Sequence, residues 1–192
     1  MSFRPFPATA CWQHRGARAG FEVAYFQARE PGWRIDGTTT AIEDGQTWVV
    51  TYSIEADAAW ATRRARIAAT TVTGPREIRL ESDGAGHWRL GGEPAPQLDG
   101  CLDVDLESSA MTNTLPVHRL GLRPGAGADA PAAYVRAATL AAGRLDQVYR
   151  RVPGEGARRY DYAAPAFGFT ARLSCDEAGL VTGYPGIAVR AG

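Results

Sequence analysis

The stretch WVVTYSIE, residues 48–55, alternates between large apolar side chains and smaller or polar ones. In an extended chain, Trp48, Val50, Tyr52 and Ile54 therefore lie on one face. A period of two residues with one polar face is typical of a half-buried antiparallel strand. This stretch predicts that the fold is mainly β.

The same alternation recurs further along the chain, in residues 77–81 and 167–176. The chain also contains 12 prolines and 22 glycines, which divide it into short pieces and so favour strands over helices. Turn-forming sequences separate the strand-like pieces; they are residues 43–45, 82–84, 153–156 and 176–179. We therefore expect consecutive β-hairpins across most of the chain.

Several segments interrupt this pattern. Residues 56–69 are rich in alanine and contain neither proline nor glycine, so they fit either a helix or a strand that continues past Trp60. Residues 105–111 fit one or two helical turns with Asp105 as the cap. Residues 121–131 combine glycine with proline, which predicts a loop.

Length and charge limit the class of function. A chain of 192 residues is at the upper end of one ordinary domain, so we expect a single domain over residues 1–192. It carries 21 basic and 21 acidic residues. This balance argues against a nucleic-acid partner, which requires a basic surface. Every basic residue is arginine; we interpret this as compositional bias, so arginine abundance carries little functional information.

The cysteines and the apolar runs indicate the compartment. Cys11, Cys101 and Cys175 are odd in number and widely spaced, which predicts free thiols in a reducing compartment. The 3 histidines lack the spacing of zinc ligands, and we expect neither a metal nor a cofactor. No run has the length of a signal peptide or a transmembrane helix. The sequence thus predicts a cytoplasmic protein without a transmembrane segment and leaves the oligomeric state open.

Residues 98–122, LDGCLDVDLESSAMTNTLPVHRLGL, hold the densest cluster of polar side chains. Asp103 and Asp105 alternate with apolar residues, so on a strand they share one face with Cα atoms roughly 6–7 Å apart. Such a pair can cap the following turn and pair with an arginine such as Arg119. It can also accept hydrogen bonds from a sugar or headgroup, bind a divalent cation, or act as a general acid and base.

Further polar residues near this pair have alternative roles. His118 combined with Asp103 and Asp105 would supply the side chains of a hydrolase, and combined with Cys101 it would supply those of a thiol nucleophile. Asn113, between two threonines, either braces a turn through its own side chain or lies at a pocket rim and binds a polar headgroup.

Glu22 is an acid within an otherwise apolar strand-like run. If its side chain faces inward, it needs a partner, because an unpaired buried charge is costly. We predict Arg64 as that partner.

The motif GCLDVDL at residues 100–106, followed by TNTLP at residues 112–116, resembles the central motif of the bacterial family named "putative glycolipid-binding". The sequence departs from that pattern at Ser109, Ala110 and His118. Matching segments of the C-terminal half extend the resemblance over nearly the whole chain; they are residues 149–151, 160–162 and 179–181.

The resemblance implies a large curved antiparallel sheet, or half-open β-barrel or roll, with one or two short helices. It also implies non-enzymatic binding of a lipid or glycolipid-like amphipathic molecule in a concave apolar groove, stabilised by burial of CH₂ groups. The residues we expect to contact the ligand are Asp103, Asp105, Asn113, His118, Arg119, Glu22, Arg64, Trp48 and Tyr160. Two alternatives stay open: a hydrolase that uses Asp103, Asp105 and His118, and an interaction domain whose sheet binds no ligand.

Overall fold

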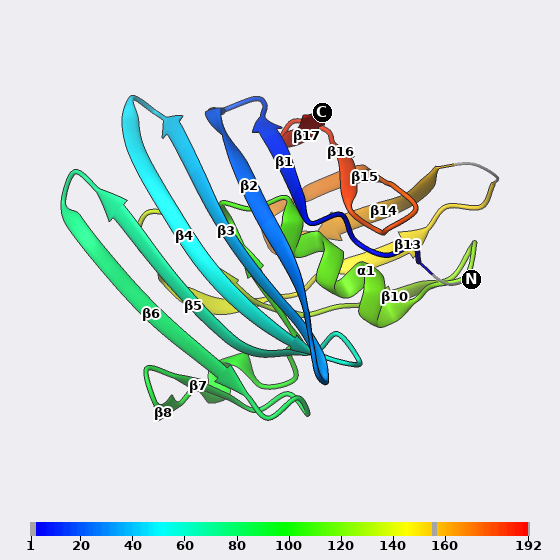
Figure 1. Ribbon diagram of the computed structural model, residues 1–192, viewed down its shortest axis with the longest axis horizontal. Helices are drawn as coiled ribbons and strands as arrows, with labels where there is room; N and C mark the ends of the chain where they lie inside the picture. Colours follow the sequence, from blue (N-terminus) through cyan, green and yellow to red (C-terminus); the bar gives the residue numbers. More distant parts are fainter. Residues whose placement is uncertain (1–2, 155–156, 192) are drawn as a thin grey trace.

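The protein is described here by a computed structural model that covers residues 3–154 and 157–191, and one long antiparallel sheet dominates it (Figure 1). One arm of this sheet contains β1 (Thr9–His14), β2 (Arg18–Arg29), β3 (Gly32–Glu43), β4 (Gln46–Asp57), β5 (Thr62–Thr71), β6 (Gly74–Ser82), β7 (Trp88–Leu90) and β8 (Glu93–Pro94). The other arm contains β10 (Gly127–Asp129), β13 (Val148–Arg151), β14 (Arg158–Ala164), β15 (Phe169–Cys175), β16 (Val181–Tyr184) and β17 (Ala188–Ala191). The arms join where β1 pairs with β17.

A smaller sheet and short helical segments complete the fold. The small sheet has the order β12 (Ala142–Leu145), β11 (Ala132–Val135), β9 (Asp103–Leu106), and its β9–β11 pair is parallel. The helical segments are the 3₁₀ turns η1 (Pro96–Leu98), η2 (Met111–Asn113) and η3 (Pro165–Phe167) and the helix α1 (Thr114–Leu120). The fold is thus mainly β with one short α-helix, as the sequence and the resemblance predicted.

The alternation in residues 48–55 is that of strand β4. Trp48, Val50, Tyr52 and Ile54 are all buried on the inner face of the sheet, whereas Val49 points outward. β4 pairs along its length with β3 and β5, so apolar side chains of neighbouring strands form one continuous inner surface. The strand prediction from this stretch is confirmed.

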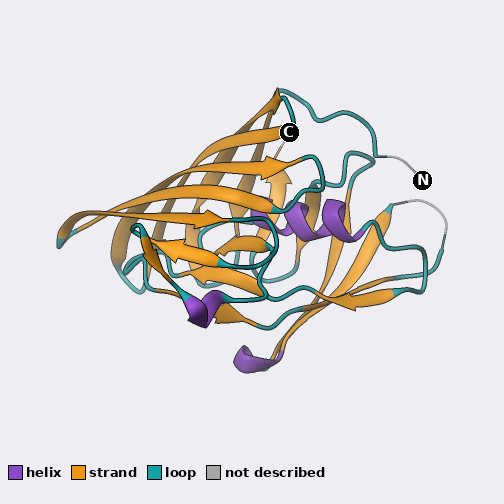
Figure 2. Ribbon diagram, turned by 90° about the horizontal axis from the view of Figure 1, so that it is seen from below, coloured by secondary structure: helices purple, strands orange, loops and turns teal. Residues whose placement is uncertain are grey.

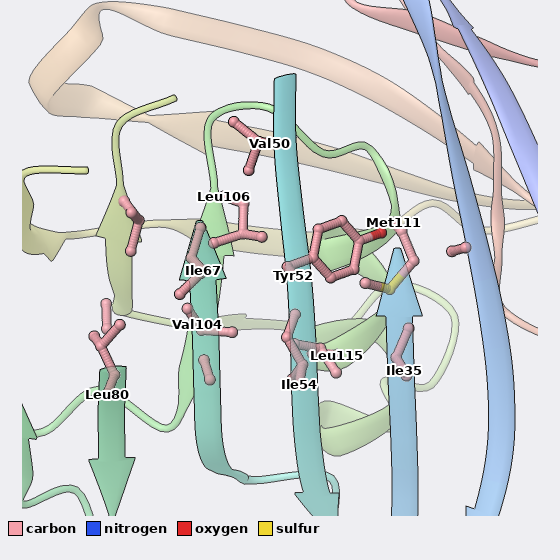
Figure 3. Close-up of a cluster of buried hydrophobic side chains, with 14 of the residues drawn as sticks. Ile35, Val50, Tyr52, Ile54, Ile67, Leu80, Val104, Leu106, Met111 and Leu115 are labelled. Atoms are coloured by element: carbon pink, nitrogen blue, oxygen red, sulfur yellow. The ribbon is translucent and has the colours of Figure 1, made fainter. Parts of the chain in front are cut away.

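The sheet bends around α1 and β9, which lie on its concave side (Figures 1 and 2). Sheet residues such as Ile54 and Ile67 face Val104, Met111 and Leu115 from β9, η2 and α1 (Figure 3). Removing this apolar surface from water stabilises the fold by about 25 cal/mol per Å². In this half of the molecule the concave face is therefore filled by the protein's own side chains.

Some local predictions need correction. Of residues 56–69, those from Thr62 onward form strand β5, and Trp60 lies in the turn before it with a left-handed φ of 69°. The helical turns expected at residues 105–111 occur later, in η2 and α1, because Asp103–Leu106 pairs as a strand with β11. The loop expected at residues 121–131 contains β10, which pairs with β13.

The predicted turn at residues 153–156 is described only in part, since Glu155 and Gly156 lie outside the described residues. Cys11, Cys101 and Cys175 are free thiols, as expected. Among the described residues, none of the helices combines the length and the apolar character that crossing a membrane requires.

Candidate ligand-binding pocket

A cavity of about 240 Å³ lies between the small sheet and the C-terminal arm of the large sheet. Its walls come from the start of β2, from β9, the segment after it and η2, from β11 and β12, and from β14, η3, β15, β16 and the turn after β16. The residues that line it are Arg18, Asp105, Leu106, Glu107, Ser109, Asn113, Tyr134, Leu145, Tyr162, Ala164, Phe167, Phe169, Tyr184 and Ile187. Of the residues predicted to contact a ligand, Asp105 and Asn113 are among them.

Strand register brings the lining residues together. The parallel pairing of β9 with β11 places Tyr134 beside Asp105. On β14 the alternation buries Tyr160, Tyr162 and Ala164, so Tyr162 faces the small sheet. The pocket therefore forms where two sheets face each other without being packed closely enough to exclude solvent.

Aromatic rings form most of the pocket wall. The rings of Tyr162, Phe169 and Tyr184 lie edge to face, with centroids 6.0–6.1 Å apart. The ring of Tyr134 meets that of Phe167 at 5.4 Å. Phe167 is 48% exposed, so it stands at the mouth. Edge-to-face contacts of this kind fix ring positions, and the pocket is therefore formed before any ligand enters.

Asp105 is the acid that faces the pocket. One of its carboxylate oxygens accepts a hydrogen bond of 2.8 Å from Thr112, and the other accepts one of 2.6 Å from Gln147. Burial raises the pKa of Asp105, the Thr112 and Gln147 hydrogen bonds oppose that rise, and nearby Asp103 and Glu107 add to it. Each carboxylate oxygen has a second lone pair, so Asp105 can still accept a hydrogen bond from a ligand.

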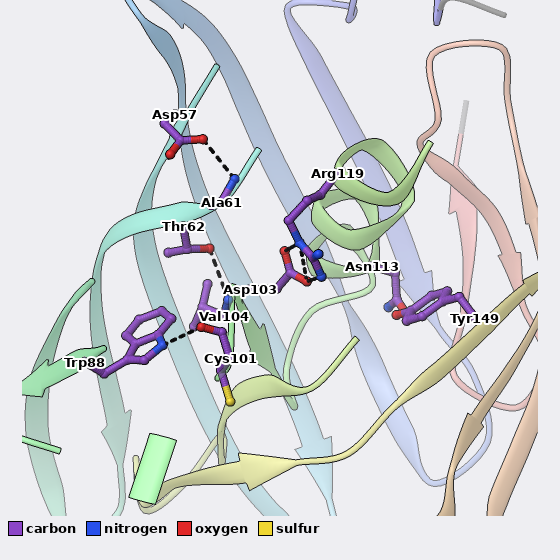
Figure 4. Close-up of polar contacts among 10 residues, drawn as sticks. All are labelled: Asp57, Ala61, Thr62, Trp88, Cys101, Asp103, Val104, Asn113, Arg119 and Tyr149. Atoms are coloured by element: carbon purple, nitrogen blue, oxygen red, sulfur yellow. Dashed lines mark hydrogen bonds and ion pairs between the residues drawn. The ribbon is translucent and has the colours of Figure 1, made fainter. Parts of the chain in front are cut away.

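Asn113 is the second predicted residue in the wall. Its side-chain oxygen accepts a 2.8 Å hydrogen bond from the hydroxyl of Tyr149, which lies beside it in Figure 4, and its amide nitrogen donates to the Ala110 carbonyl at 3.3 Å. The amide group thus braces the start of α1 and lines the pocket at once. One of its two N–H bonds is left for a ligand.

Arg18 and Glu107 set the charge at one side of the pocket. Arg18 donates a 3.0 Å hydrogen bond to Glu43, lies 3.7 Å from the Glu107 carboxylate, and places its guanidinium over the Trp48 ring. The charged residues that line the cavity are Arg18, Asp105 and Glu107. When all three are ionised, the two acids outweigh the one arginine and the lining carries a net negative charge.

Asp103 points away from the cavity toward α1. Arg119 binds its carboxylate from two nitrogens, at 3.0 and 2.5 Å (Figure 4). Asp103 is 1% exposed, and burial raises its pKa while Arg119 opposes that rise. Of the alternatives left open for the two acids, pairing with an arginine is thus present at Asp103, where Arg119 fastens α1 to β9; Asp105 accepts from Thr112 and Gln147 instead.

Glu22 has partners other than the predicted one. Its carboxylate accepts hydrogen bonds from the Tyr52 and Ser109 hydroxyls and from the backbone N–H groups of Ala110 and Met111. Arg64 is instead exposed, 3.4 Å from Glu55. The predicted Glu22–Arg64 pair is therefore wrong, because β2 faces the segment after β9 and four neutral donors take the place of one cation.

The fully buried Glu22 still acts on the pocket. Burial raises its pKa, against the hydrogen bonds that Ser109 and Tyr52 donate. Ser109 lines the cavity, so the carboxylate positions a wall residue rather than facing the cavity itself.

His118 lies elsewhere. Its ring stacks on Phe3 at 3.9 Å, lies 4.2 Å from the Trp60 ring, and donates a hydrogen bond to the Ala178 carbonyl. Burial lowers its pKa to about 4. With Asp103 paired to Arg119 and Asp105 facing the pocket, the three side chains of the hydrolase alternative do not share a site.

The two aromatic candidates belong to the core. Trp48 is 4% exposed and Tyr160 is 1% exposed, and neither lines the cavity. Sequence reasoning missed the rings that do line it, chiefly Tyr134, Tyr162 and Tyr184. The alternation in residues 167–176 was a usable signal for Phe169, but it gives a face of a strand and not what lies opposite that face.

A larger surface cleft of about 710 Å³ lies at the far end of β2–β6. Its arginines are matched by acids: Arg34 lies 2.8 Å from Asp36, and Arg63 lies 3.5 Å from Asp57. Because these charges compensate one another and the cleft has a single aromatic residue in its wall, we consider the smaller cavity the better site. No cluster of metal-ligating side chains occurs in the part of the chain that the structure describes.

The fold and the cavity define a β-barrel-like protein whose large sheet stays open and carries a small aromatic pocket. The chain belongs to the family described as "Putative glycolipid-binding", whose profile matches residues 9–190. The crystal structure of a DUF1089 family protein from Pseudomonas aeruginosa is similar, with a TM-score of 0.77 and 34% identity over 88% of this chain and 92% of that one. The family resemblance found in the sequence is confirmed.

A second structure shares the fold alone. It is a β-barrel-like protein of the domain of unknown function DUF1849 from Brucella abortus, with a TM-score of 0.56 and 12% identity over 98% of this chain and 96% of that one. No curated protein matches the chain.

Proposed function

We propose that the protein binds a lipid or glycolipid-like amphipathic molecule without covalent chemistry, and that the cavity beside Asp105 holds the ligand's polar headgroup. The observation that carries this proposal is that aromatic side chains surround one half-buried hydrogen-bond acceptor, the Asp105 carboxylate. Ligand sites typically combine apolar walls with a few polar groups that fix orientation. The family description supports the same class of ligand.

The size of the cavity decides which part of the ligand enters. At about 240 Å³ it lies below the range of about 300–1,000 Å³ typical of sites that enclose a whole small molecule. It suits one headgroup, and the acyl part then extends past Phe167 at the mouth.

The chemistry of the wall favours a neutral, hydroxyl-bearing headgroup such as a sugar. Sugar hydroxyls donate to carboxylates, and Asp105 keeps lone pairs for them, whereas the C–H face of a sugar ring packs on aromatic rings such as those of Tyr162 and Phe169. An anionic headgroup would meet Asp105 and Glu107, with Arg18 already shared between Glu43 and Glu107. Like charges brought together in this way are unfavourable.

Two measurements test the proposal. Mass spectrometry of solvent extracts from natively purified protein should find a bound lipid, and a fluorescent alkyl glycoside should bind saturably. Octyl glucoside, used below its critical micelle concentration, should displace this probe more strongly than octanoate does.

Variants then locate the site. Asp105→Asn and Phe169→Ala should each weaken binding of the probe by about tenfold, the loss expected when one charged hydrogen bond or one buried ring is removed. Tyr25→Ala is the matched control, since Tyr25 is 54% exposed on the outer face of β2. If no lipid co-purifies and the alkyl glycoside shows no saturable binding, the proposal is refuted and an interaction domain without a ligand is favoured.

A further inference from the structure

The turn between β14 and β15 has an unusual composition for a hairpin end. Residues 163–169 read AAPAFGF and contain no polar side chain. Pro165, Ala166, Phe167 and Gly168 are all exposed. Hairpin turns normally carry polar residues, and a run of exposed apolar residues in such a place is a defect unless it has a function. We call residues 165–168 the apolar tip.

The apolar tip is also prominent in shape. In Figure 2 the hairpin that ends in a short helical turn projects away from the body of the molecule. Other exposed aromatic residues, Phe21 and Tyr25, lie instead along the outer face of β2, between neighbouring strands. The apolar tip can therefore enter the apolar layer of a lipid bilayer while the rest of the sheet stays outside it.

A cation, Arg136, lies behind the apolar tip. The Arg136 guanidinium lies 6.0 Å from the centroid of the Phe167 ring, and its side chain is 54% exposed. Its carboxylate partner, Glu107, is 3.7 Å away. Long basic side chains beside an apolar surface are suited to lipid headgroups, because the stem packs on apolar groups while the charge stays among phosphates.

The tip and the pocket are continuous. Phe167 belongs to the apolar tip and lines the mouth of the cavity, and Phe169, the next residue but one, lines the cavity beyond it. A molecule that leaves a bilayer beside Phe167 would therefore meet the aromatic wall without crossing open water.

We propose that the apolar tip inserts reversibly into the surface of a lipid bilayer, with Arg136 at the level of the headgroups, and so connects the membrane to the pocket. The transfer of a ligand along this path rests on the proposed function, whereas the membrane contact itself does not. A short apolar tip without a covalent lipid gives weak, reversible attachment.

The test is co-sedimentation of the full chain with vesicles of phosphatidylcholine mixed equally with phosphatidylglycerol. The wild-type protein should sediment with them, and Ala166→Asp and Phe167→Ser should each lower its partition coefficient by about tenfold or more, because a charge or a lost ring opposes insertion. Ala166 does not line the pocket, so Ala166→Asp should leave alkyl-glycoside binding unchanged. Phe21→Ser, at an equally exposed ring on β2, is the matched control.

The outcomes separate the two proposals. If the wild type stays in the supernatant, or if Phe21→Ser lowers sedimentation as much as the tip variants do, the membrane contact is overturned, whatever the alkyl glycoside does. Dimerisation of the wild type that Ala166→Asp abolishes, without vesicle binding, would overturn it in favour of a second copy on the tip. Sedimentation that depends on the tip, in a protein that neither co-purifies with a lipid nor binds the alkyl glycoside, supports the contact and refutes the proposed ligand function.

Discussion

Tyr52 and Glu22 lie 30 residues apart in the chain, and the Tyr52 hydroxyl donates a 2.6 Å hydrogen bond to the Glu22 carboxylate in the core. The same carboxylate receives the backbone N–H groups of Ala110 and Met111. Through these hydrogen bonds Glu22, on β2, holds the segment after β9 in place. That segment carries Ser109, a residue of the pocket wall. This connection makes the stability of the fold and the shape of the pocket depend on one acid.

Replacing Glu22 by glutamine should destabilise the protein by about 1–3 kcal/mol, because the amide oxygen can still accept from the Ala110 and Met111 N–H groups, but the NH₂ group must donate to the Tyr52 and Ser109 hydroxyls and the hydrogen bonds to a carboxylate are lost. Urea denaturation measures the change. Glu81→Gln, at an exposed acid on β6, is the control and should stay within about 0.5 kcal/mol of wild type. Equal stability of the two variants would contradict the role given to Glu22.

Breaking the Asp103–Arg119 pair from one side should be costly. Arg119→Ala leaves a buried carboxylate unpaired, and the expected loss is about 3–5 kcal/mol of unfolding free energy. In the double variant Asp103→Leu/Arg119→Met, both charges are absent, and much of that loss should be recovered. A double-mutant cycle built from Asp103→Leu, Arg119→Met and their double variant, measured by chemical denaturation, would disprove the pairing if it showed no coupling between the two positions.

Stability should fall in mild acid because of the buried His14. Burial first, and the nearby Arg18 second, lower the pKa of His14 from 6.5 to about 4. Between these two values the unfolded chain binds a proton that the folded protein does not, so folding stability decreases as the pH falls through this window. The expected loss from this residue is about 2 kcal/mol between about pH 7 and about pH 5.

His14→Leu tests the origin of that loss. Both ring nitrogens of His14 are buried without a hydrogen-bond partner, so an apolar side chain should be tolerated near neutral pH. His14→Leu should make the dependence of unfolding free energy on pH less steep, and the remaining loss in this window comes from His118, whose pKa burial also lowers to about 4. His87→Gln is the control: Asp83 raises the pKa of the exposed His87, and this variant should keep the loss in acid. An unchanged slope in His14→Leu would refute the assignment.

Gly179 is expected to tolerate no side chain. Its φ is +81°, and an added Cβ would lie 2.6 Å from the His118 ring and 2.9 Å from the Phe3 ring. Gly179→Ala should therefore cost about 1–2 kcal/mol in backbone strain and about 1–3 kcal/mol in overpacking. Gly91→Ala isolates the first contribution, since Gly91 also has a positive φ but open space around it. Thermal melts should place Gly179→Ala clearly below Gly91→Ala.

Sequence reasoning predicted best what depends on neighbouring residues. The alternation at Trp48–Ile54 gave the strand and its buried face, because the period of two is a local property of an extended chain. Arg119 was also named as a candidate partner for Asp103 and Asp105, since all three lie in the same stretch of sequence, and the structure pairs it with Asp103. The partners of Glu22 could not be predicted in the same way, because the curvature of the sheet decides which segment faces β2.

The helix and the pocket illustrate the same limit. α1 was missed because its seven residues include a proline and β-branched side chains, which disfavour a helix in isolation; Asp103 and the core hold it in place. The aromatic pocket wall was missed because the alternation of apolar and polar residues identifies only the inward-facing side chains of β14 and β15. It does not say whether the small sheet opposite packs against these side chains or leaves a cavity.

The order of strands in the large sheet runs from β10 to β8 without returning to its start. A closed barrel has a circumference fixed by its number of strands and their stagger, and widening it breaks a ladder of hydrogen bonds. An open sheet has no such constraint, since small changes of twist at each strand pair alter its curvature while every pair stays intact. The large sheet can therefore change its overall curvature while every strand pair stays intact, which the fixed circumference of a closed barrel would not allow.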